Sequence, residues 1–191
     1  MTKLRLSRAI FAITISTAIP AIEAQTPPAK PANAEEKSPT SLAREIHHQL
    51  LVLPYYSVFD NIGFTLRGRT VTLTGQVMRP TLKANAEAAV KSIEGVAVVS
   101  NQIEVLPASP DDDDLRRAAY RAIYEDPALA PYGALAIPPI HIIVKNGAVT
   151  LEGFVDSASD KSLAAARAAK VANVQSVKNN LVVPSKGSAG E

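Results

Sequence analysis

A repeated segment constrains this chain more than any other feature of its sequence. Residues 71–77 read VTLTGQV and residues 149–155 read VTLEGFV, a spacing of 78 residues. The match continues without a gap on both sides, from Ile62 with Ile140 to Val105 with Val183. A repeat of that length is a duplicated supersecondary unit. We therefore expect two small domains with the same fold. Because a domain of this size buries too little apolar surface to be stable by itself, we also expect the two to pack against each other.

The first 24 residues have the pattern of a secretory signal peptide. Three basic residues precede an apolar run from Ala9 to Ile19, and small residues follow up to Ala24. The run is about eleven residues long, whereas a helix that spans a bilayer needs about 20. We expect cleavage after Ala24 and export of the remaining chain. A retained signal anchor is the alternative.

Charge and cysteine content exclude several classes of function. The chain holds 20 basic and 18 acidic residues, and the leader holds three of the basic residues and one acidic residue. The remaining chain therefore has 17 of each, which does not favour nucleic acid as a partner. Cysteine is absent, so disulfides, thiolate metal sites, a cysteine nucleophile and a lipid-bearing cysteine are excluded.

The rest of the chain divides by composition. Residues 25–40 are rich in Pro, Ala and Lys without apolar periodicity, which predicts a disordered linker. Residues 41–106 and 113–184 carry the two repeats, joined by a linker at 107–112. A disordered tail is expected at 185–191.

Each repeat predicts the order helix, strand, strand, helix, strand. Helix starts of the form Ser-Pro stand at 38–39 and 109–110, and Asn146-Gly147 between alternating apolar residues is a strong hairpin signal. The predicted class is α+β, with each copy a three-stranded mixed sheet that has two helices on one face. Gly75 and Gly153 recur inside the second strand, where we expect a helix to cross closely.

No pattern in the chain favours an enzyme. His47 and His48 are neighbours on a helix and point about 100° apart, and His141 lies on the polar side of a strand. No nucleophile elbow, P-loop or dinucleotide-binding motif occurs. We expect no catalytic, cofactor-binding or metal-binding residue and no small-molecule substrate.

Two features are candidate contact surfaces. The first is an apolar insertion at residues 127–139 of the second copy, which marks a membrane or protein contact. The alternative is that this loop folds back over its own domain. The second is the basic hairpin tips, where each exposed cation near an anionic leaflet contributes about 1 kcal/mol. The alternative there is plain solvation. The candidate residues are Leu129, Tyr132, Leu135, Ile137, Arg67, Arg69 and Lys145.

The repeated unit resembles the BON domain. The resemblance rests on the V-T-L-x-G-x-V strand, the Gly-Val or Asn-Val after the second helix, and the final strand Val-x-Asn-x-Ile/Leu-x-Val. A leader followed by two such domains is similar to the osmotically inducible periplasmic protein Y family. The resemblance implies a periplasmic protein without catalytic activity that binds phospholipid surfaces during osmotic stress.

Two functional hypotheses follow. The first is a peripheral, reversible association with the phospholipid surface of the cell envelope, without a cofactor and without a transmembrane span. The second is an adaptor or holdase-type chaperone that recognises envelope proteins through the apolar loop and the sheet edges, because an open edge readily accepts an added strand.

Overall fold

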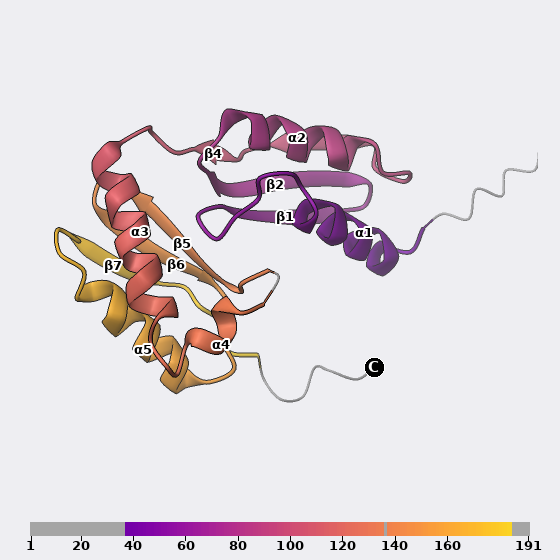
Figure 1. Ribbon diagram of the computed structural model, residues 1–191. Coiled ribbons are helices and arrows are strands. Elements are labelled where there is room, and N and C mark those ends of the chain that lie inside the picture. Colours follow the sequence, from indigo (N-terminus) through magenta and orange to yellow (C-terminus); the bar gives the residue numbers. More distant parts are fainter. Residues whose placement is uncertain (1–36, 136, 185–191) are drawn as a thin grey trace, which may run out of the picture. The chain divides into compact units, whose positions relative to one another are not determined.

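The computed structural model describes residues 37–135 and 137–184 (Figure 1). The predictions of a signal peptide at 1–24 and a tail at 185–191 lie outside the described residues, as do residues 25–36 of the predicted linker. The last two residues of that linker, Pro39 and Thr40, already belong to the first helix. The described chain is α+β with two mixed sheets, which confirms the predicted fold class.

The first half follows the predicted order of elements. The helix α1 (Pro39–Leu51) begins at Ser38, whose side chain accepts a 3.2 Å hydrogen bond from the Ser41 N–H. The hairpin β1 (Asn61–Arg67) and β2 (Thr70–Val77) follows, then α2 (Pro80–Lys91). The last strand is divided into β3 (Val98–Asn101) and β4 (Glu104–Val105).

The first sheet is mixed because its central strand, β2, has an antiparallel neighbour on one side and parallel neighbours on the other. It pairs with β1 in the antiparallel sense and with β3 and β4 in the parallel sense. The last strand is interrupted after Asn101, whose side-chain oxygen accepts the Ile103 N–H while its amide donates to the carbonyl of Lys83. Asn179 makes the same two bonds in the second half, to Leu181 and Lys161. These asparagines are architectural.

The second half repeats this order with one addition. The helix α3 (Pro110–Tyr124) is capped by Ser109, and a short helix α4 (Ala130–Gly133) occupies part of the insertion. Then come β5 (Ile140–Lys145), β6 (Ala148–Gly153), α5 (Ala158–Ala169) and β7 (Ser176–Asn179). The strand β6 lies between antiparallel β5 and parallel β7.

Each half has its own apolar core between its helices and one face of its sheet. In the first half Val71, Leu73 and Val77 of β2 point into that core, as the alternating pattern predicts. The core residues of the first half are Leu42, Ile46, Leu50, Leu53, Val71, Leu73, Val77, Leu82, Ala86, Val90, Ile93 and Ile103. Those of the second half include Leu115, Ala119, Ile123, Leu129, Ile140, Ile142, Val144, Val149, Leu151, Val155, Ala164, Ala168 and Leu181.

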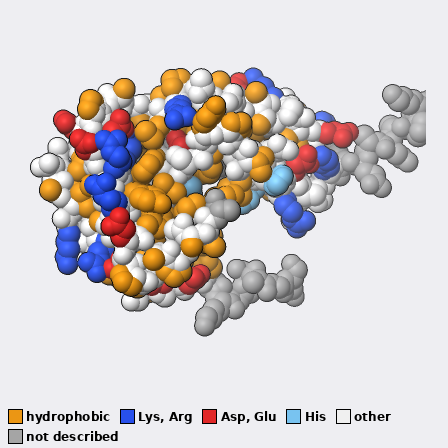
Figure 2. Space-filling model, in the orientation of Figure 1, with side chains coloured by type: hydrophobic (Ala, Val, Ile, Leu, Met, Phe, Trp, Pro, Cys, Tyr) orange, Lys and Arg blue, Asp and Glu red, His pale blue; other side chains and the backbone are white. Residues whose placement is uncertain are grey.

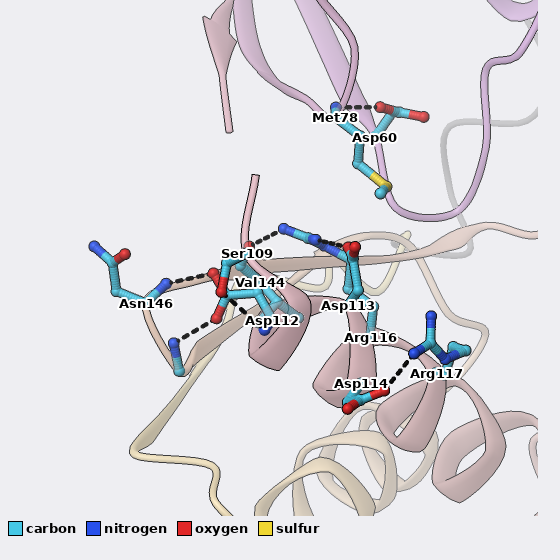
Figure 3. Close-up of polar contacts among 11 residues, drawn as sticks. Asp60, Met78, Ser109, Asp112, Asp113, Asp114, Arg116, Arg117, Val144 and Asn146 are labelled. Carbon is cyan, nitrogen blue, oxygen red and sulfur yellow. Dashed lines mark hydrogen bonds and ion pairs between the residues drawn. The ribbon is translucent and has the colours of Figure 1, made fainter. Parts of the chain in front are cut away.

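Two buried carboxylates accept hydrogen bonds that hold loops and turns in place. Asp60 accepts hydrogen bonds from the Ser57 N–H, the Ser57 hydroxyl and, at 2.7 Å, the Met78 N–H (Figure 3). Asp112, in the first turn of α3, accepts the backbone N–H groups of Asn146 and Gly147, both at 2.8 Å. Asp112 belongs to the acidic run 111–114, so one member of that run anchors a hairpin turn.

The two halves are in contact, as their small size predicts. The Ile142 N–H at the edge of β5 donates to the carbonyl of Val58 at 2.7 Å, and Phe59 packs against the second core. Lys145 pairs with Glu104 at 2.5 Å. The loop before β1 therefore covers part of the second domain.

Candidate interaction surfaces

The apolar insertion folds back over its own domain in part. Leu129 is fully buried and Tyr132 is 8% exposed, both in the second core. The Tyr132 hydroxyl donates to Asp160 at 2.9 Å and accepts the Asp156 N–H at 2.8 Å. Burial raises the pKa of Tyr132 to about 12, so this hydroxyl remains protonated at neutral pH. For Leu129 and Tyr132 the alternative therefore holds, since the loop folds back over its own domain and buries both side chains in the core.

Two other residues of the insertion are exposed. Leu135 is 53% exposed, and Ile137 is also exposed. Leu135 and the exposed Phe154 both line a cavity of about 380 Å³. Asp156 and Asp160 line the same cavity, so its rim is acidic. An acidic rim opposes an anionic headgroup and suits a basic, apolar partner.

The basic hairpin tips are partly engaged within the protein. Arg69 donates from Nε to the carbonyl of Gly95 at 3.0 Å, and Lys145 is paired with Glu104. Arg67 is exposed at the β1–β2 turn. Two of the three predicted cations therefore already have a protein partner, which weakens this surface as an anion attractant. The contact role of Arg67 remains a prediction.

The repeated glycines permit a close approach between neighbouring strands. Gly75 and Gly153 have φ of 114° and 106°, in the region that favours glycine. A Cβ on Gly75 would lie 2.1 Å from the carbonyl oxygen of Asn61, and one on Gly153 would lie 1.9 Å from that of Pro139. The expected helix crossing is therefore wrong: the close neighbour is the backbone at the start of the adjacent strand.

A surface on α3 was not among the sequence-based candidates. Arg117, Tyr120 and Arg121 are exposed on one side of the helix, and together with Phe59 they line an apolar cavity of about 260 Å³. The rings of Phe59 and Tyr120 meet edge to face with centroids 6.2 Å apart. Arg117 pairs with Asp114 one turn earlier (Figure 3). Figure 2 shows basic side chains in a row over α3, beside a broad apolar area.

Part of this α3 surface has a sequence signal. Arg117 and Arg121 are four residues apart, so on a helix they share a face with Tyr120 between them. Phe59 has no such signal, because it comes from the other half of the chain and its position depends on the contact between the halves.

Comparison with protein families decides the classification. The BON domain family profile matches residues 55–107 and 111–185. The chain belongs to the BON-domain family. BON domains are associated with phospholipid binding and with envelope and osmotic-stress proteins, and they are generally binding modules without catalytic activity.

Other comparisons add little to the BON assignment. None of the curated proteins matches this chain. Among solved structures, the C-terminal domain of CdsD, a structural protein of the type III secretion system of Chlamydia trachomatis, is 14% identical with a TM-score of 0.27. The match covers 75% of this chain and 98% of that chain. A second CdsD structure is 15% identical, also with a TM-score of 0.27, and 92% of it is covered. TM-scores this low carry no argument about function.

The histidines of this BON-domain protein differ in their surroundings. His47 and His48 are exposed on α1, whereas His141 is 9% exposed and lies 5.6 Å from the ring of Tyr56, centroid to centroid. Burial lowers the pKa of His141, although the backbone of Asp60 and Ser57 and, less strongly, the carboxylates of Asp60 and Glu152 act in the opposite direction. Its Nδ1 has no hydrogen-bond partner among the described residues. His141 is therefore a packed neutral imidazole between the two BON domains.

The helices carry one further finding relevant to membranes. No helix within residues 37–135 and 137–184 combines the length and the apolar character that crossing a bilayer requires.

Proposed function

We propose that this BON-domain protein is exported and binds reversibly to anionic phospholipid surfaces through α3, without catalysing a reaction. The main support for this proposal is the cavity that Phe59 and Tyr120 line together with Arg117 and Arg121. The association of BON domains with phospholipid binding supports the choice of ligand. The compartment rests on the signal peptide pattern of residues 1–24 and on the family, both of which favour the periplasm.

The chemistry of the α3 surface suits a headgroup interface. A guanidinium presents several donors in a plane and binds phosphate oxygens in a bidentate manner. Aromatic rings such as Tyr120 are stable at the boundary between headgroups and acyl chains. Arg121 makes no ion pair among the described residues, so its charge is available to a ligand. Arg117 can exchange its exposed Asp114 partner for a phosphate, because exposed pairs contribute only about 0–1 kcal/mol.

The expected affinity is low. Each arginine near an anionic leaflet contributes about 1 kcal/mol, and that contribution falls off within a Debye length. Two arginines and one partly inserted ring therefore give a weak, salt-sensitive association. This is consistent with a peripheral protein that leaves the membrane easily.

Vesicle co-sedimentation tests the proposal. The mature protein is mixed with vesicles of pure phosphatidylcholine or with about 30% phosphatidylglycerol, at about 20 mM and 150 mM salt. The test variant is Arg117→Gln with Arg121→Gln. The matched control is Lys170→Gln with Lys178→Gln, which removes the same charge from exposed residues elsewhere in the second domain. We expect binding to the anionic vesicles that weakens with salt and is lost only in the arginine variant.

The results that contradict the proposal are equally definite. Equal loss of binding in the lysine control shows that only net charge matters. No binding of the unaltered protein to anionic vesicles at low salt refutes the lipid function.

The adaptor hypothesis is favoured by a separate observation. The acidic, apolar cavity at Leu135 and Phe154 adjoins the end of β7, where Val182 is exposed. The strand β7 pairs only with β6 among the described strands, so its other edge is open to an added strand. This surface suits an extended, basic and apolar segment of another protein. Site-specific cross-linking from Leu135 and Phe154 tests it, and a failure to recover an envelope protein from either position contradicts it.

A further inference from the structure

A further cavity lies in the second BON domain and is mostly distinct from the aromatic cavity on α3. It has a volume of about 780 Å³, within the range of small-molecule sites. It lies between α3, the β5–β6 turn and the loop from α5 to β7. It shares Arg117 and Arg121 with the aromatic cavity, and its other lining residues include Asp111, Leu115, Asn146, Val171, Asn173 and Gln175.

A comparison of the two BON domains explains why this groove is open. In the first domain Ala97 N–H donates to the carbonyl of Arg69, and in the second Gln175 N–H donates to that of Gly147, so Arg69 and Gly147 are equivalent. The Arg69 side chain crosses to the carbonyl of Gly95. Glycine at 147 has no side chain to make this crossing. The groove in the second domain therefore lacks the arginine that crosses the equivalent position in the first, and Gln175 packs on Gly147 instead.

The wall of the groove is held rigidly. The buried Asp112 fixes the backbone of the β5–β6 turn, and the buried Arg116 donates to the carbonyl of Val144 at 2.6 Å (Figure 3). Gln175 packs directly on Gly147, since a Cβ there would lie 2.8 Å from its Nε2. A site held in place before binding loses less conformational entropy when a ligand arrives.

The polar groups of the groove are nearly balanced in charge. Asp112 is occupied by backbone N–H groups, and Asp114 pairs with Arg117. One carboxylate, Asp111, and one guanidinium, Arg121, remain. With these opposite charges balanced, the groove favours a neutral ligand while the Arg117–Asp114 pair is intact, and phosphate binds the two arginines only where that pair is exchanged, as proposed for the phospholipid contact.

Three amide side chains determine the class of ligand. Asn146, Asn173 and Gln175 are exposed and line the groove. An amide both donates and accepts hydrogen bonds, as hydroxyl and acetamido groups do. Leu115, Ala118 and Val171 provide an apolar surface for the C–H face of a ring. We propose that this groove binds a neutral saccharide that carries hydroxyl or acetamido groups, an activity beyond the lipid function.

The test uses NMR titration of the mature protein with tri-N-acetylchitotriose and, separately, with maltotriose. Inorganic phosphate and glycylglycine are the anionic and zwitterionic comparisons. We expect amide shift changes at Asn146, Asn173 and Gln175 with at least one trisaccharide. The variants Asn173→Gly and Gln175→Ala should each weaken binding roughly tenfold, since each removes hydrogen bonds to the ligand.

Matched variants keep the test decisive. Asn173 has φ of 67°, so glycine removes the amide without backbone strain, as Gly95 does in the first domain. Asn85→Ala removes an exposed amide from α2 and should leave saccharide binding unchanged. Asn173→Gly should still bind anionic vesicles, which separates this proposal from the lipid function. The proposal is overturned if neither trisaccharide shifts these residues, if phosphate or glycylglycine shifts them instead, or if both groove variants bind like the unaltered protein.

Discussion

The carboxylate of Asp112 accepts a 2.8 Å hydrogen bond from the backbone N–H of Gly147, 35 residues later in the chain. It also accepts the Asn146 N–H and is only 2% exposed. Asp112→Ala leaves these donors without a partner. We expect the free energy of unfolding to fall by about 2 kcal/mol, measured by urea denaturation. Asp114→Ala, which removes an exposed pair in the same helix, should cost less than about 0.5 kcal/mol. Equal effects of the two variants would contradict the anchoring role.

The repeated glycines give a second prediction. A methyl group on Gly75 would lie 2.1 Å from the Asn61 carbonyl oxygen, at a φ that alanine rarely adopts. We expect Gly75→Ala, and likewise Gly153→Ala, to lower the free energy of unfolding by more than about 2 kcal/mol. Gly68→Ala is the control, because its φ is 58° but no atom lies within 4 Å of the added carbon. That variant should cost about 1 kcal/mol. A Gly68 variant as unstable as the Gly75 variant would refute the steric explanation.

The fold was largely predictable because the turn, capping and alternation signals in the sequence all favour the same structure. The Asn146-Gly147 turn fixes the register of β5 with β6, and alternation places Val149 and Leu151 in the core. Ser38 and Ser109 cap the helices that they were expected to start. These are local signals, and a chain with few conflicts among them has few competing folds.

The surfaces were less predictable because they depend on contacts between distant segments. The burial of Leu129 and Tyr132 depends on packing within the second core and on the hydrogen bond from Tyr132 to Asp160 of α5, which no local pattern encodes. His141 lies on the polar side of β5 and is nevertheless buried, since Tyr56 of the first domain packs on it. Phe59 joins the α3 surface for the same reason.

The buried His141 gives a pH-dependent prediction. Its pKa is lowered from 6.5 in the folded protein, so below about pH 6.5 the unfolded chain takes up a proton that the folded protein does not. The folded state therefore loses stability as the pH falls through this range, by no more than about 1.4 kcal/mol per pH unit. Above about pH 6.5 this residue contributes no pH dependence.

Urea denaturation at about pH 7.5 and 5.5 tests this prediction. The loss of stability between the two values should be smaller in His141→Gln than in the unaltered protein. His47→Gln, at an exposed position on α1, should behave like the unaltered protein. A His141 variant with the full pH dependence would show that His141 does not cause it.

The claim that α3 contacts phospholipid is tested most directly by a fluorescent reporter at Tyr120. The protein contains no tryptophan, so Tyr120→Trp introduces a single emitter at the proposed contact, and Tyr55→Trp places one at an exposed site in the first domain. With anionic vesicles containing brominated lipid, emission from the Tyr120→Trp variant should shift to shorter wavelength and be quenched, while emission from the Tyr55→Trp variant stays unchanged. Quenching in the Tyr55→Trp variant alone, or in neither variant, would contradict the account.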